Sequence, residues 1–114
     1  MRFLVDDGRS YLPDGSIPDV IIRFPKAALS LIVIGWLRNE DELYLDHDMG
    51  DKEYDGHFIA SEMEKMWRQD PMWAQLHIPS KIVCVSDNPQ GRLRIEQAIA
   101  NITKMRDKWE ATHA

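Results

Sequence analysis

The stretch that decides the fold is Leu45-Asp46-His47-Asp48-Met49-Gly50, an acidic segment directly after a short apolar run. A second acidic pair, Asp6-Asp7, closes the apolar opening of the chain in the same way. Neighbouring carboxylates repel one another unless a positive group lies between them, so packing explains neither segment. If the two runs are parallel neighbouring strands, their carboxyl ends meet at one crevice, where open α/β sheets bind ligands. The sequence therefore predicts a site for a hard cation or a phosphate.

Composition limits the class of protein. The chain has 114 residues, 44% hydrophobic content and a formal charge of −5, which suits one domain over residues 1–114 and disfavours coating of a nucleic-acid backbone. The single cysteine, Cys84, excludes an internal disulfide and lies among apolar neighbours. The longest apolar run, residues 27–37, is shorter than the roughly 20 residues of a membrane span. We expect a cytoplasmic protein without a membrane segment.

Strand and helix patterns alternate along the chain. Apolar and β-branched runs predict four strands, at residues 3–6, 20–24, 42–46 and 81–86. Apolar spacing and length predict helices at 26–37 and 57–68 and a long closing helix with an apolar stripe from Ile95 to Trp109. Asp70-Pro71 ends the second helix, and a connecting stretch follows it. Alternation of this kind predicts a parallel α/β sheet of about four strands flanked by helices.

The segment between the first two strands lacks helical periodicity. Glycines and prolines at positions 8, 13, 15 and 18 indicate a long loop instead. We therefore expect the first helix of an alternating fold to be reduced or missing.

Three boxes of sequence carry a family resemblance. They are Asp6-Asp7-Gly8-Arg9, Leu45 to Gly50, and Asn88-Pro89-Gln90-Gly91-Arg92. Together they resemble the cyclic-phosphate processing receiver-like family, a relative of response-regulator receiver domains. The resemblance extends from Phe3 to about Ile102. It implies a three-layer, receiver-like (flavodoxin-like) fold, a divalent cation held by carboxylates, and a role with cyclic-phosphate ends in RNA repair or nucleotide signalling.

Two departures from the family pattern bear on activity. A histidine is usual in the family where this chain has Val85, so a potential general acid or base is lost. A lysine follows the fifth strand of a phosphorelay receiver, but no fifth strand is visible here. Phosphorylation of an aspartate is therefore disfavoured.

The acidic residues are the candidate cation ligands. Mg²⁺ or Mn²⁺ takes oxygen ligands from a few carboxylates together with water and substrate phosphate. We assign this role to a group of four residues: Asp6, Asp7, Asp46 and Asp48. The alternative for all four is a set of solvated loop acids, and Asp48 has the further alternative of capping a turn.

The remaining candidates concern catalysis and the phosphate. His47 and Asp46 are the catalytic candidates. The imidazole of His47 can move a proton near neutral pH, while the alternative for His47 is a histidine that anchors the loop. Four residues are candidates for phosphate binding through guanidinium, hydroxyl or amide groups: Arg9, Ser86, Asn88 and Arg92. For Arg92 the alternative is pairing with a nearby acid, and Asn-Pro turns also form for local reasons.

Two functions follow from these assignments. The first is cation-dependent binding or processing of a small phosphate-bearing ligand or an RNA end, as a metal-dependent phosphoesterase. The second is a non-catalytic interaction module that binds a protein partner through its acidic face or through Trp67, Met72 and Trp73. A four-stranded sheet also leaves edges that a homo-oligomer would cover.

Overall fold

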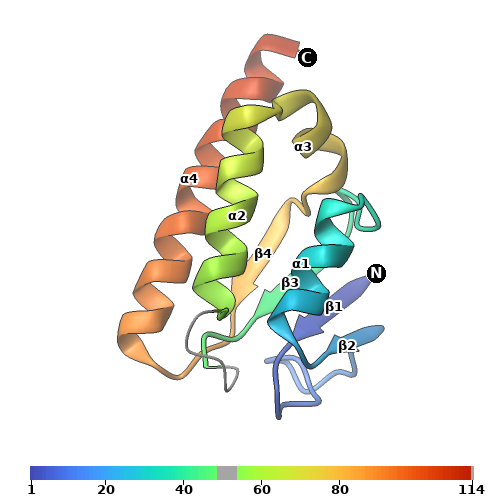
Figure 1. Cartoon of the computed structure of the whole chain (residues 1–114), viewed down its shortest axis with the longest axis vertical. Coiled ribbons are helices and arrows are strands. Elements are labelled where there is room, and N and C mark those ends of the chain that lie inside the picture. The colour runs from blue at the N-terminus through green and yellow to red at the C-terminus, as the bar shows by residue number, and fades with distance from the viewer. Residues whose placement is uncertain (49–53, 114) are drawn as a thin grey trace.

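One parallel sheet organises the chain (Figure 1). The computed structural model describes residues 1–48 and 54–113. The strands lie in the order β2-β1-β3-β4. Their bounds are β1 (Arg2–Val5), β2 (Val20–Ile22), β3 (Glu42–Leu45) and β4 (Lys81–Cys84). The order reverses direction between β1 and β3, which is the switch point where sheets of this kind bind ligands. The predicted parallel sheet of about four strands is confirmed.

Four helices accompany the sheet in the described part of the chain. They are α1 (Pro25–Val33), α2 (Gly56–Gln69), α3 (Pro71–His77) and α4 (Pro89–His113). The prediction of a plain connecting stretch after Asp70-Pro71 was wrong, because α3 occupies it. The Asp70 side chain accepts a hydrogen bond from the Trp73 amide at 3.2 Å, and proline fits the first turn of a helix. The same two residues therefore end one helix and start the next.

The first of these helices is shorter than its apolar pattern predicts. The sequence predicted a helix over 26–37, whereas α1 ends at Val33. Gly35 follows with a φ of 77°, a left-handed conformation that glycine adopts without steric cost. Leu37 is nevertheless buried in the core, which explains why the apolar pattern continues past the helix end.

All four helices contribute to a core on one face of the sheet. Phe3, Leu43 and Ile82 share one row of this face and lie in the same cluster as buried residues of every helix. The opposite face carries Leu4 and Tyr44, which pack with Leu12 of the long loop between β1 and β2. The loop therefore forms the third layer. Residues 6–19, all of them described, contain no helix between β1 and β2, as the sequence predicted.

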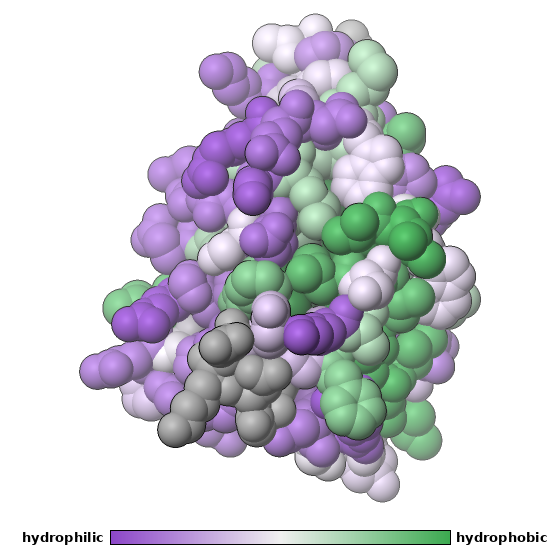
Figure 2. Space-filling view, viewed as in Figure 1, coloured by the Kyte–Doolittle hydropathy of each residue, from purple (hydrophilic) through white to green (hydrophobic). Residues whose placement is uncertain are grey.

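The face of the molecule seen in Figure 2 divides into a polar and an apolar part. In Figure 2 hydrophobic residues gather over α1, whereas the region of α2 and α4 is largely hydrophilic. Exposed apolar side chains around α1 include Phe24, Val33 and Ile34. Trp67 is only 2% exposed and belongs to the core, so of the three residues Trp67, Met72 and Trp73 only the last two reach the surface. Among the described residues, no helix combines the length and hydrophobicity needed to cross a bilayer.

Candidate cation site at the carboxyl edge of the sheet

The strand register places the acidic boxes side by side. Val5 is paired with Leu45, and Leu45 with Cys84, so these strands end in one row. The pairing continues one residue further, because the Asp46 amide donates to the Val5 carbonyl at 3.0 Å. Asp6 and Asp46 therefore follow neighbouring strands at the same edge, at the switch point of the sheet.

Asp6 is buried and only partly satisfied. Its Oδ1 accepts hydrogen bonds from the amides of Gly8 at 2.9 Å and Arg9 at 2.8 Å, which fold the chain into a tight turn. Its Oδ2 is buried and has no hydrogen-bond partner among the described residues. The Arg9 guanidinium forms an ion pair with this oxygen, with its Nε 3.8 Å from Oδ2. Buried carboxylate oxygens are normally hydrogen-bonded, so this atom has capacity for a ligand.

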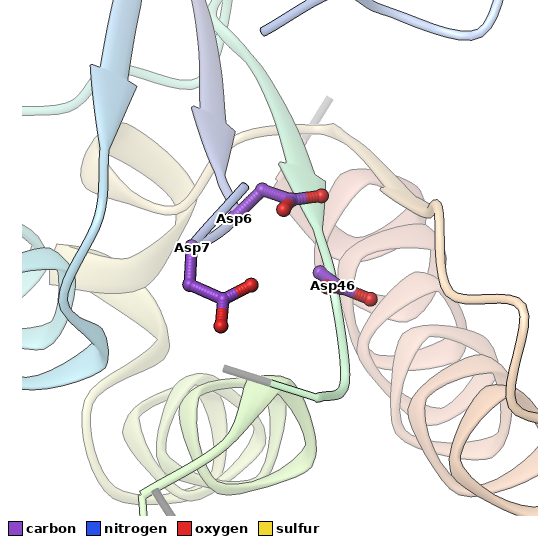
Figure 3. A group of neighbouring side chains, drawn as sticks. All are labelled: Asp6, Asp7 and Asp46. Atoms are coloured by element: carbon purple, nitrogen blue, oxygen red, sulfur yellow. The ribbon is translucent and has the colours of Figure 1, made fainter. Parts of the chain in front are cut away.

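Three carboxylates converge at this point. Figure 3 shows Asp6 and Asp7 leaving the end of β1 and Asp46 leaving the end of β3. One oxygen from each lies within 4.8 Å of the others. Burial, followed by the charge of Asp6, raises the pKa of Asp46 above its usual value. A divalent cation between the three groups would remove this repulsion, and their oxygen chemistry suits Mg²⁺ or Mn²⁺.

Asp48 and His47 lie beside this group. Asp48 is exposed and is not one of the three clustered carboxylates. Its two oxygens instead contact His47 Nδ1 at 2.9 Å and Asn88 Nδ2 at 3.4 Å. The other ring nitrogen of His47, Nε2, lies 3.3 Å from Asp55 Oδ2. Both ring nitrogens therefore face carboxylates. Met49 and Gly50, the end of the same sequence box, lie outside the described residues.

Three residues that were not predicted as site residues also shape this region. Asp55 caps α2 by accepting from the Phe58 amide at 2.8 Å, and it also contacts His47. A Cβ at Gly56 would lie 2.0 Å from the Asp46 carbonyl oxygen, and one at Gly91 would lie 2.2 Å from His47 Cγ. Asp-Gly at 55–56 is a sequence typical of turns. The close approach of Gly56 to the Asp46 carbonyl and of Gly91 to the His47 ring depends on tertiary structure, which the sequence does not show.

The third sequence box forms a hydrogen-bonded turn at the start of α4. The Ser86 hydroxyl is buried and accepts from the Asn88 amide at 3.1 Å. Asn88 Oδ1 accepts from the amides of Gln90 at 3.1 Å and Gly91 at 3.0 Å, as a helix cap does. These bonds occupy helix amides that would otherwise be available to an anion. The Arg92 guanidinium contacts Glu96 at 2.6 Å and the Ser86 carbonyl at 3.2 Å.

Arg9 connects the acidic group to this turn. Its guanidinium donates to the Val85 carbonyl and, at 3.2 Å, to Asp87 Oδ2. Beside it is an open cavity of about 560 Å³, lined in part by Arg9, Val85, Asp87 and Arg92. The structure thus brings both predicted phosphate-binding arginines to one hollow, while Arg9 also approaches Asp6.

The topology and the three boxes agree with a comparison against known families. A family model described as the cyclic-phosphate processing receiver domain matches residues 1–101. The chain belongs to this family. No curated protein and no solved structure was found to match it.

The two departures from the family pattern can be placed in the structure. Val85 is 5% exposed and packs with Leu4 and Tyr44 on the loop-covered face of the sheet. At this position the receiver domain has an apolar contact and a carbonyl that binds Arg9 rather than a titratable side chain. Among the described residues the sheet contains four strands, and α4 extends to His113.

Proposed function

We propose that this receiver domain binds a divalent cation between Asp6, Asp7 and Asp46 and uses it to bind or process a phosphate-bearing ligand. A cyclic phosphate of RNA or of a nucleotide is the proposed ligand, in line with the family description. The observation that carries the proposal is the buried Oδ2 of Asp6, which has no hydrogen-bond partner among the described residues and lies in a group of three carboxylates.

The charges of the site support binding of both the cation and the phosphate. The three carboxylates each offer one oxygen, and these oxygens lie within 4.8 Å of one another. Oxygen atoms of this kind are the ligands of a hard cation. When bound, the cation would polarise a phosphoryl oxygen or activate water. The guanidinium groups of Arg9 and Arg92 beside the 560 Å³ cavity match phosphate oxygens, and both side chains are partly exposed. Arg92 would exchange its exposed contact with Glu96 for the ligand.

We propose that His47, whose amide donates to Asp46 Oδ1, performs the proton transfer of catalysis. Its ring nitrogens contact Asp48 and Asp55, so it would exchange one of these contacts when it moves a proton. The same two contacts fit the alternative role of a loop anchor. Ligation by Asp48 would likewise require it to leave His47. Both roles are proposals, as is phosphate binding by Ser86 and Asn88, whose polar groups already stabilise the turn.

Thermal unfolding with and without Mg²⁺ and a 2′,3′-cyclic mononucleotide tests the proposal. Ligands that bind only the folded chain raise the midpoint, by about 2.7 kcal/mol of stabilisation at one hundred times the dissociation constant. We expect Mg²⁺ to raise the midpoint and the nucleotide to raise it further only when Mg²⁺ is present. Asp46→Asn should lose both increments, whereas Arg92→Gln should lose only the second.

Asp107→Asn on the exposed surface of α4 is the matched control, because it removes one carboxylate outside the cluster. It should keep both increments. An unchanged wild-type midpoint under every condition would contradict the proposal. Where the nucleotide binds, ³¹P NMR distinguishes the cyclic diester from the monoester that hydrolysis would produce, and so separates binding from processing.

A second candidate function is a protein-interaction module, favoured by the apolar surface over α1 (Figure 2). Phe24 and Ile34 are each 72% exposed, at the two ends of that helix. Exposed apolar groups of this kind occur at contact surfaces. A pull-down in which Ile34→Glu loses a partner that Asp46→Asn retains would support this function, and equal partner recovery with both variants would contradict it.

A further inference from the structure

The loop that carries two of the three clustered carboxylates is held by an arginine that follows β2. Arg23 Nη1 donates to the carbonyl of Asp6 at 3.1 Å and to the carbonyl of Arg9 at 2.7 Å. Its Nη2 donates to the Ser10 hydroxyl at 3.0 Å. One guanidinium thus makes three hydrogen bonds to three residues of the loop segment 6–10. None of the three sequence boxes contains this arginine.

These bonds act on the turn that shapes the cation site. The Asp6 side chain folds residues 6–9 through bonds to the amides of Gly8 and Arg9, while Arg23 fixes the carbonyls at the two ends of the same turn. A further bond, from the Asp6 amide to the Ile22 carbonyl at 3.1 Å, ties the turn to the end of β2. The orientation of Asp6 Oδ2 therefore depends on contacts from β2 as well as from its own strand.

Arg23 also influences the position of the neighbouring arginine. The Arg9 backbone is bonded to Arg23 through its carbonyl, and the Arg9 side chain extends to Val85 and Asp87. A single residue outside the acidic group thus supports a proposed cation ligand and a proposed phosphate contact together. A guanidinium suits this task because its planar fork can donate to several acceptors at once, which the ammonium group of lysine cannot do in the same geometry.

We propose that Arg23 is a positioning residue that preorganises the 6–10 loop for cation binding without contacting the cation. This inference rests on the proposed function. Replacement of residues that orient metal ligands without binding the metal lowers metal affinity by roughly 10- to 100-fold. We expect Arg23→Met to weaken Mn²⁺ binding within that range and Arg23→Lys to weaken it less.

Arg2, the first residue of β1, provides a matched control because its guanidinium bonds to the same long loop. Its guanidinium donates to the Ser16 hydroxyl at 2.8 Å and to the Ile17 carbonyl at 3.1 Å, in the half of the loop away from residues 6–10. Arg2→Met therefore removes two comparable hydrogen bonds from the loop without touching the turn at Asp6. It should lower the thermal midpoint and leave the Mn²⁺ dissociation constant within about twofold of wild type. That change is much smaller than the roughly tenfold or greater change expected of Arg23→Met.

The experiment is the Mn²⁺ dissociation constant of the full chain, measured by electron paramagnetic resonance well below the unfolding midpoint of each variant. Weaker binding in Arg23→Met, partial recovery in Arg23→Lys and unchanged binding in Arg2→Met support the inference. Equal affinity in wild type and Arg23→Met overturns it while leaving the proposed function intact. Absence of Mn²⁺ binding in wild type overturns both. If Arg23→Met does not fold, wild-type affinity in Arg23→Lys and Arg23→Gln overturns the inference.

Discussion

The carboxyl edge of the sheet has two polar halves that differ in their hydrogen bonding. In the acidic half, around Asp6 and Asp46, like charges lie close together and a buried oxygen has no hydrogen-bond partner among the described residues. In the turn at residues 86–92, the polar side chains of Ser86 and Asn88 bond to backbone amides of the same turn. Asp6 bonds to its own turn through Oδ1 and keeps Oδ2 available to the proposed cation, whereas the side chains of Ser86 and Asn88 hold the chain at their turn.

The largest loss of stability should come from a substitution that adds a side chain against the backbone of the acidic half. Gly56→Ala would place a methyl group 2.0 Å from the Asp46 carbonyl oxygen, an atom of the backbone that cannot move aside easily. We expect the free energy of unfolding to fall by about 3 kcal/mol, with loss of cation binding. Chemical denaturation measures the change. Gly8→Ala is the control, because its added Cβ would meet no described residue within 4 Å apart from its chain neighbours. Equal stability of the two variants would contradict this packing.

A smaller loss should follow from damage to the turn. Asn88→Ala removes the oxygen that caps the first amides of α4, and loss of such a cap costs about 1 kcal/mol. We expect denaturation to show this loss while the Mg²⁺-induced rise of the thermal midpoint persists. A variant that loses its Mg²⁺ response would show that Asn88 belongs to the cation site.

The acidic half should also respond to pH in a definite direction. Burial and the charge of Asp6 raise the pKa of Asp46 above its unfolded value. The stabilisation from its protonated form is therefore complete below the unfolded pKa and is lost as the pH rises through the folded pKa. Without cations, Asp46→Asn should be more stable than wild type at neutral pH, and the difference should shrink on acidification. Denaturation across this range measures it, and a difference that grows on acidification would contradict the sign.

The smallest effect concerns an exposed ion pair. Arg92 and Glu96 lie four residues apart on α4, with 2.6 Å between Nε and Oε1, and about half of each side chain is exposed. Pairs of this kind contribute about 0.3–0.5 kcal/mol. Glu96→Gln should therefore change stability by no more than that, while releasing Arg92 for an anionic ligand. A larger loss in denaturation would mark the pair as structural.

Much of the fold could be predicted from the sequence because its signals are local. The apolar runs that precede Asp6 and Asp46 marked both strands, and the glycines and prolines of the long loop indicated a missing helix. The short helix α3 was missed because Asp70-Pro71 was interpreted only as a stop, although an acidic cap followed by proline is also a start.

The site was predictable only in outline. The convergence of Asp6, Asp7 and Asp46 followed from strand ends at one edge. The direction in which the Asp48 side chain points could not be predicted from the strand ends, because it depends on contacts with His47 and Asn88. The role of Arg23 could not be anticipated either, because its bonds join residues 13–17 positions apart across two strands.

The most direct test of the central claim locates the cation within the folded chain. Mn²⁺ added below stoichiometry to ¹⁵N-labelled protein broadens the NMR signals of amides near the ion. We predict early loss of the amides of Gly8 and His47, which donate to the carboxylates of Asp6 and Asp46, and retention of both signals in Asp46→Asn. Broadening centred on another part of the chain, or the same broadening in the variant, would contradict the account.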